Sequence, residues 1–177
     1  MKLDLSSRNL IDLSEKTHES HIHHTTTILS LSSNLLPKVP RHLLHFIHLR
    51  KLDLSQNQLT CLNLRDLPLT LRWLSLKSNQ ISEIQFFFGN NERIGNGHHV
   101  LKTFSNLEFL DISNNSLKGV LDEFNQLFPR LRTLFLADNL IKKLPEEWPS
   151  SLIHLDLSEN ALHNFDACRS LKTLKNL

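Results

Sequence analysis

The chain has 177 residues, of which 40% are hydrophobic and 21% are charged, a composition typical of a folded domain rather than of a disordered segment. The formal net charge is +2, with acidic and basic residues interspersed, so the sequence gives no electrostatic signal for nucleic-acid binding. No apolar segment approaches the roughly 18 residues of a membrane span, and Met1–Glu15 lacks the apolar region of a signal peptide. We therefore expect one domain in the cytoplasm, with neither a membrane nor nucleic acid as partner.

The two cysteines, Cys61 and Cys168, lie far apart in the sequence. They lack the close spacing of a metal-binding motif, and one pair is too few for a disulfide framework. We expect both thiols to be free and at least half-buried, as suits a reducing compartment.

A short leucine-rich pattern recurs along the chain, as "LDLSQNQL" from Leu52, "LFLADNLI" from Leu134 and "LDLSENAL" from Leu155. Alignment on L-x-x-L-x-L-x-x-N-x-L gives seven copies. The polar position is occupied by Arg8 in an irregular first copy and by asparagine in the others: Asn34, Asn57, Asn79, Asn115, Asn139 and Asn160. Successive polar positions are 26, 23, 22, 36, 24 and 21 residues apart. Five of these spacings fall in or near the roughly 20 to 29 residue period of a leucine-rich repeat.

These copies resemble the leucine-rich repeat family over essentially the whole chain. The resemblance implies an α/β fold: a right-handed, horseshoe-shaped solenoid with a concave parallel sheet and a convex side of short helical turns and extended segments. We expect a single domain over 1–177 with about seven repeats. The copies with Phe46, Phe104 or Phe128 before their first leucine resemble intracellular repeats of the phosphatase-regulatory and Ras-adaptor kinds. The copies with Pro68 or Pro149 at the same position resemble those of bacterial effectors and some Toll-like receptors. We favour the intracellular type, in a fragment of a larger protein.

The strand of each copy explains why the pattern is repeated. In "LDLS", Leu52 and Leu54 point to one face of a short strand, while Asp53 and Ser55 point to the other. A single unit cannot bury its leucine face, so neighbouring copies are expected to stack as parallel strands around a continuous core. The asparagine lies where the chain turns away from the strand, and its amide can bond the inward-facing backbone groups there.

Three residues before the first leucine of the unit, on the other side of the turn, three copies carry Phe and two carry Pro. Phe46, Phe104 and Phe128 mark copies with room for a helical turn, as in 40–52, where Leu43, Phe46 and Ile47 recur with helical spacing. Pro68 and Pro149 mark the two copies with the shortest spacings. These copies are expected to follow an extended path, because proline fixes φ and has no N–H donor.

Two parts of the chain depart from the repeat. Residues 85–103 hold three of the four glycines, and we expect a loop or hairpin there in which at least one of Phe86, Phe87 and Phe88 enters the core. At the C-terminal end, Leu171, Leu174 and Leu177 match the approach to an incomplete eighth repeat. Further chain or another subunit is expected to cover this end.

Histidines are the most prominent candidates for metal binding or catalysis. His18, His21, His23 and His24 lie close together, and His42, His45 and His48 recur at every third residue. A solvent-facing loop and an exposed polar helix face explain the two groups better than a set of metal ligands, since no cysteine or carboxylate pair completes a site. No nucleophile motif is present. We therefore expect no metal, no cofactor and no catalysis.

The exposed face of the sheet is the better candidate site. The residues on either side of the second leucine of each copy are, in chain order, Lys2/Asp4, Ile28/Ser30, Lys51/Asp53, Trp73/Ser75, Phe109/Asp111, Thr133/Phe135 and His154/Asp156. Large rings gather in the middle, with charged residues around them, as in the hot spot and polar rim of an interface. The predicted partner-binding residues are Trp73, Phe109, Phe135, His154, Asp111, Asp138, Asp156 and Lys77. Alternatively, Trp73 and Phe109 cover each other or lie under the 85–103 insertion.

These features favour a non-enzymatic module that binds a protein partner on the concave face. One alternative is the sensor or substrate-recruiting part of a larger enzyme, such as a ligase, a kinase or a phosphatase regulator. Another is a fragment of an extracellular receptor, for which Asn114-Asn115-Ser116 supplies one glycosylation sequon.

Overall fold

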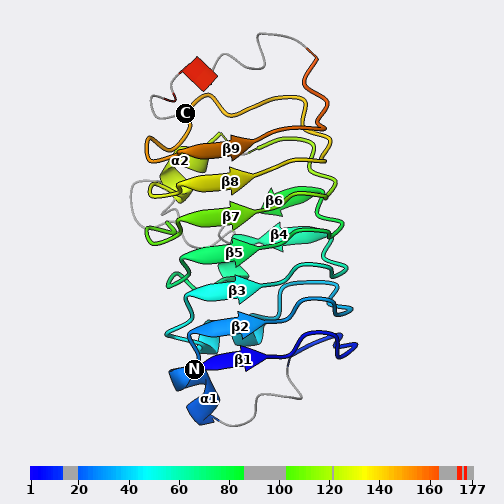
Figure 1. Cartoon of the computed structure of the whole chain (residues 1–177), viewed down its shortest axis with the longest axis vertical. Helices are drawn as coiled ribbons and strands as arrows, with labels where there is room; N and C mark the ends of the chain where they lie inside the picture. The colour runs from blue at the N-terminus through cyan, green and yellow to red at the C-terminus, as the bar shows by residue number, and fades with distance from the viewer. Residues whose placement is uncertain (14–19, 86–102, 121, 164–170, 173, 175–177) are drawn as a thin grey trace, which may run out of the picture.

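The computed structural model describes residues 1–13, 20–85, 103–120, 122–163, 171–172 and 174. Within these residues, a seven-stranded parallel sheet runs the length of the molecule in the order β1-β2-β3-β5-β7-β8-β9 (Figure 1). Its strands are β1 Lys2–Asp4, β2 Ile28–Ser30, β3 Lys51–Asp53, β5 Trp73–Ser75, β7 Phe109–Asp111, β8 Thr133–Phe135 and β9 His154–Asp156. The predicted leucine-rich repeat fold is therefore confirmed.

The sheet pairs equivalent residues of successive repeats. Lys51 of β3 lies beside Trp73 of β5, which lies beside Phe109 of β7. The central leucine of each strand points to the opposite face, as the two-residue period requires, and Leu52 and Leu134 are fully buried. Burial of the same side chain in unit after unit builds one continuous core along the stack.

The asparagine ladder joins consecutive units through backbone groups. In each of the six copies the side-chain oxygen accepts a hydrogen bond from an N–H of the preceding unit, and the side-chain nitrogen donates to carbonyls of both units. For Asn139, Oδ1 lies 2.9 Å from the nitrogen of Leu117, and Nδ2 lies 3.0 Å from the oxygens of Ile112 and Leu136. The predicted role of this position is confirmed, since each amide satisfies groups that would otherwise be buried without partners.

A left-handed residue precedes every asparagine of the ladder. These residues have φ between 51° and 57°, and they are Ser33, Gln56, Ser78, Asn114, Asp138 and Glu159. This conformation reverses the chain after the strand and directs the next side chain inward. The same turn occurs at Ser7, before Arg8 of the first unit.

The opposite side of the stack carries short, varied elements. The helical turns are α1 Ser20–Thr25, η1 Arg41–His45, η2 Leu64–Asp66 and α2 Phe124–Leu127. Two further strands, β4 Cys61–Asn63 and β6 Glu83–Gln85, form a separate parallel pair behind the main sheet (Figure 1). Among the described helices, none has the length and apolar character needed to span a bilayer.

The helical turns predicted for the copies with Phe46 and Phe128 are present in the structure. The turn η1 precedes Phe46, and α2 precedes Phe128; both rings are buried. Ile47 is 48% exposed, although it follows Leu43 with helical spacing. The turn is a 3₁₀ helix, whose three residues per turn align Leu43 with Phe46 but carry Ile47 to the outside.

The Pro copies follow the predicted path in part. The segment between Asn139 and β9 contains no helix, in agreement with an extended course to Pro149. Ahead of Pro68, however, β4 leads into the 3₁₀ turn η2, where the side chain of Asn63 accepts a hydrogen bond from the N–H of Arg65. This cap stabilises a turn that proline alone does not predict.

Several predictions fall outside the described residues. They concern most of the 85–103 insertion with Phe86, Phe87 and Phe88, together with His18, Cys168 and Leu177. At the C-terminal end, Leu171 and Leu174 are partly buried against the core.

Candidate functional site

Three aromatic side chains form a strip across the exposed face of the seven-stranded sheet. Trp73 and Phe109 lie at paired positions of β5 and β7, and their rings stack with centroids 5.0 Å apart and planes 10° apart. Phe135 of β8 meets Phe109 edge-on, with centroids 5.7 Å apart. We call Trp73, Phe109 and Phe135 the aromatic strip. Each of its side chains is half-buried, so the rings cover one another and still present apolar surface to solvent.

A cation extends the strip toward the N-terminal units. The ammonium nitrogen of Lys51, one strand before Trp73, lies 4.0 Å from the centroid of the indole ring. This geometry is a cation–π contact, which favours the position of the ammonium group over the ring. The alignment follows from the repeat, because in-register pairing places the two residues side by side, about 4.8 Å apart between strands.

Carboxylates gather at the ends of the strands, beside Phe135. A cavity of about 490 Å³ is lined by Lys77, Asp111, Ser113, Asn114, Phe135, Ala137, Asp138 and Asp156. We call Asp111, Asp138 and Asp156 the acidic edge. Lys77 is the cation among the residues of this cavity. Of the eight predicted partner-binding residues, seven therefore belong to the strip or to the adjoining cavity. The eighth, His154, is exposed on β9 and lies beyond Thr133 in the row of Phe109.

The aspartates of the "LDLS" motif have a structural role that the sequence analysis missed. Oδ1 of Asp111 accepts hydrogen bonds from the N–H and the hydroxyl of Ser113, at 2.9 and 2.6 Å. Asp156 makes the same pair of contacts with Ser158, and these bonds lower the pKa of its carboxyl group. The signal was present, because Asp and Ser recur two residues apart in four of the copies, beginning at Asp4, Asp53, Asp111 and Asp156.

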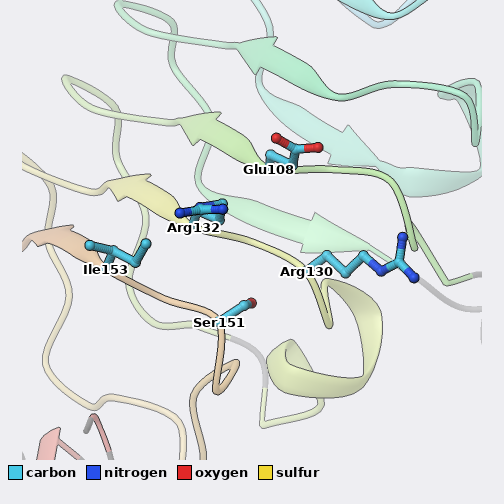
Figure 2. Close-up of a pocket in the computed structure, with 5 residues that line it drawn as sticks. All are labelled: Glu108, Arg130, Arg132, Ser151 and Ile153. Atoms are coloured by element: carbon cyan, nitrogen blue, oxygen red, sulfur yellow. The ribbon is translucent and has the colours of Figure 1, made fainter. Parts of the chain in front are cut away.

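Arginines lie on the opposite edge of the sheet, where the strands begin. Arg50, Arg72 and Arg132 each come directly before a strand, and Arg130 lies close by; we call these four residues the basic edge. Arg132 and Arg130 line a cavity of about 540 Å³ with Glu108, Ser151 and Ile153. Figure 2 shows Glu108, Arg132 and Ile153 at the starts of successive strands. A second cavity of about 130 Å³ contains Arg50 and Arg72 among its lining residues. Sequence reasoning missed this edge, because it considered only positions within the strands and just after them.

One carboxylate interrupts the basic edge. Glu108 lies 3.7 Å from the guanidinium of Arg72, and both side chains are about half exposed. An ion pair this exposed is weak, so it holds neither side chain firmly. The edge therefore keeps a positive character, with four arginines beside one glutamate.

The described histidines are not arranged as a metal centre. Within the described residues, no group of three or more metal-binding side chains is arranged to hold an ion. The prediction of a loop for the first group is wrong in part, because Ser20–Thr25 forms the helix α1. His23 of this helix is half-buried, with its ring 4.7 Å from that of Phe46 and 5.6 Å from that of His45. The sequence could not reveal this contact, because the two groups of histidines come from different units.

The one described cysteine is poorly suited to nucleophilic chemistry. Cys61 is half-buried on β4, paired with Glu83 of β6, and is a free thiol. Burial, followed by the charge of Glu83, raises the pKa of the thiol to about 11. Little thiolate is therefore present at neutral pH.

Comparisons with known proteins agree with the repeat and the fold. A family model described as Leucine Rich Repeat matches residues 48–69, and one described as Leucine Rich repeats (2 copies) matches residues 105–149. The leucine-rich repeat domain of the type III effector XopL superposes with a TM-score of 0.64 at 19% identity, covering 89% of this chain and 52% of that domain. A chain of the Drosophila Toll–Spatzle complex superposes with a TM-score of 0.62 at 18% identity, covering 89% of this chain and 20% of that one. The chain is a leucine-rich repeat protein.

Among curated proteins, the sequence is similar to receptors and to a glycoprotein. Mouse Toll-like receptor 9 is 34% identical over 143 residues, which make up 68% of this chain and 14% of the receptor. Human oligodendrocyte-myelin glycoprotein is 32% identical over 160 residues, or 90% of this chain and 32% of the glycoprotein. The chain thus spans about a third or less of the length of these relatives. The intracellular type stays a prediction.

Proposed function

We propose that this chain is a non-enzymatic recognition module that binds a protein partner on the exposed face of its seven-stranded sheet. The aromatic strip is the observation that supports this proposal. Trp73, Phe109 and Phe135 lie side by side on three adjacent strands, half-exposed and next to a cavity with charged walls. Large aromatic side chains with a polar rim are characteristic of interface hot spots, since they bury much surface while losing little conformational entropy.

The test compares binding by two double variants. Trp73→Ala/Phe109→Ala removes the stacked pair, whereas Ile11→Ala/Leu44→Ala removes two exposed apolar side chains outside the strands of the sheet. Proteins captured by the wild-type chain are quantified by mass spectrometry, and the leading candidate is purified and titrated by calorimetry. We expect the first variant to weaken binding at least tenfold, about 1.4 kcal/mol, and the control to bind like the wild type.

The fold of both variants is checked by circular dichroism and thermal unfolding. Trp73 and Phe109 lie outside the leucine core, so the variant is expected to stay folded. Unchanged binding by a folded Trp73→Ala/Phe109→Ala variant would show that the strip is not the site.

A second candidate is that the chain forms the recognition part of a longer receptor. The receptor names of several relatives and the small share of each that the chain covers favour this candidate.

We propose the cytoplasm as the location, which the free thiol of Cys61 supports. Asn114 can distinguish a cytoplasmic module from part of a receptor, because it begins a glycosylation sequon and is exposed. An N-linked glycan on Asn114 of the native protein would favour the receptor and exclude the cytoplasm.

A further inference from the structure

The aromatic strip is flanked by charges of opposite sign: Trp73 and Phe109 lie in the row next to the basic edge, and Phe135 lies in the row of Asp111 and Asp156. On one side, the basic edge consists of Arg50, Arg72, Arg130 and Arg132, opposed by Glu108. On the other side, the acidic edge consists of Asp111, Asp138 and Asp156, opposed by Lys77. A partner that covers the strip therefore meets arginines along one flank and aspartates along the other.

The width of this arrangement matches an α-helix. Arg50, Arg72 and Arg132 come directly before their strands. Asp111 and Asp156 are the last residues of theirs, three positions further along. At about 3.3 Å per residue, the backbones of the two rows are roughly 10 Å apart. A helix with its side chains is about 10 to 12 Å wide, so its two flanks reach both rows while its underside rests on the rings.

The repeat along the strip also favours a helix lying across the strands. Neighbouring strands are about 4.8 Å apart, and side chains spaced three and four residues apart on a helix rise by about 4.5 and 6 Å. One apolar side chain per turn can therefore contact each of Trp73, Phe109 and Phe135 in succession. In an extended segment the side chains on one face recur about every 6.6 Å. This spacing differs from the strand spacing of about 4.8 Å, so the side chains no longer lie over the rings after two strands.

We infer that the partner segment is an amphipathic helix whose apolar stripe is flanked by acidic side chains on one side and basic side chains on the other. Its acidic flank faces the basic edge, and its basic flank faces Asp111, Asp138 and Asp156. This inference rests on the proposed function, because it names the partner of the same aromatic strip. Opposite charges on facing surfaces favour the correct partner and disfavour partners of uniform charge.

Synthetic helices of defined charge test the inference directly. Three side-chain-stapled peptides of about 15 residues, long enough to extend from β3 to β9, share one Leu and Phe stripe. Their flanks carry Glu on one side and Lys on the other, Glu on both sides, or Lys on both sides. A fourth peptide has the mixed composition but contains central prolines that prevent helix formation. Binding is measured by fluorescence anisotropy at low and at physiological salt concentration.

Charge variants assign the effect to the two edges. Arg72→Glu/Arg132→Glu reverses part of the basic edge, and Lys38→Glu/Lys142→Glu makes the same change of charge at exposed sites outside the sheet. Asp111→Asn/Asp138→Asn neutralises two members of the acidic edge. The asparagine at position 111 keeps an oxygen that accepts the hydrogen bonds of Ser113, so the turn is retained.

We expect the mixed helix to bind the wild-type chain at least tenfold more tightly than either uniform helix or the proline peptide, with weaker binding at higher salt. Arg72→Glu/Arg132→Glu should shift the preference to the Lys-flanked helix. Asp111→Asn/Asp138→Asn should remove the discrimination against the Glu-flanked helix, and the control variant should keep the wild-type order. Equal binding of the three helices, tighter binding by a uniform helix, equal binding of the proline peptide or no binding at all would each overturn the inference.

Failure here is distinguishable from failure of the proposed function. Equal affinities that are lost in Trp73→Ala/Phe109→Ala would refute the charged flanks while leaving the strip as a binding site. Peptide binding that is unchanged in that variant would refute both.

Discussion

At the scale of single residues, the ladder asparagines most distinguish this chain from a simple stack of leucines. Each amide bonds backbone groups of two consecutive units, so it stabilises the interface between the units as well as its own turn. Because these groups face inward, water cannot replace a lost amide without entering the stack.

Replacement of a ladder asparagine should therefore be costly. In Asn79→Ala, the N–H of Leu59 and the carbonyls of Leu54 and Leu76 lose their partner. We expect a loss of about 1 to 3 kcal/mol in the free energy of unfolding, measured by urea denaturation. The neighbouring exposed Gln80→Ala is the matched control and should change stability by less than about 0.5 kcal/mol. Equal stability of the two variants would contradict a structural role for the ladder.

At the scale of elements, the contact between α1 and η1 is expected to make the stability of the fold depend on pH. Burial first, and then the charges of His45, His24 and His42, lower the pKa of His23 below its ordinary value of 6.5. Within the described residues, Nε2 of His23 is buried without a hydrogen-bond partner, so a proton added there has no acceptor. Since the unfolded chain binds this proton more readily than the folded chain, stability is lost as the pH falls through 6.5 toward the lower folded value.

The variant His23→Gln should reduce this pH dependence. We expect the urea midpoint of the wild-type chain to fall between about pH 7.5 and about pH 5.5, and the midpoint of His23→Gln to fall less. His48→Gln, at an exposed position, should keep the wild-type slope. If all three proteins showed parallel pH profiles, His23 would not be the group responsible.

At the scale of the whole molecule, the stack is a one-dimensional array in which each unit contacts only its neighbours. Equivalent leucines therefore differ in burial according to their place in the stack. Leu134 of β8 is fully buried, whereas Leu155 of β9 is only partly buried, although the register pairs them directly.

This difference predicts unequal effects of the same substitution. Leu134→Ala should lower the free energy of unfolding by about 2 to 5 kcal/mol, because it leaves a cavity in the closed core. Leu155→Ala should cost clearly less, since part of that side chain is already in contact with solvent in the free chain. Urea denaturation of both variants at one protein concentration measures the difference. Equal losses would mean that the chain shields Leu155 as fully as Leu134.

Most of the fold was predictable from the sequence because it depends on local pattern. Alternating leucines at a spacing of 21 to 26 residues specify a short strand per unit, and units with the same buried surface can stack only in register. The same alignment predicts that Trp73 lies beside Phe109, as the register confirms. The helical turns were less predictable, as Ile47 shows. Apolar residues three positions apart, such as Leu43 and Phe46, fit both a 3₁₀ and an α-helix, so the sequence does not show on which side the fourth residue lies.

The sequence by itself determined the repeat, the core leucines, the asparagine ladder and the rows of residues on the exposed face. Only the tertiary structure decided how these side chains meet: Trp73 stacked on Phe109 under Lys51, His23 against His45 and Phe46, and arginines and aspartates on opposite edges. The reason is physical. A periodic pattern fixes which residues face the same way, whereas contacts between them depend on side-chain conformations and on units that are distant in the sequence and adjacent only after folding.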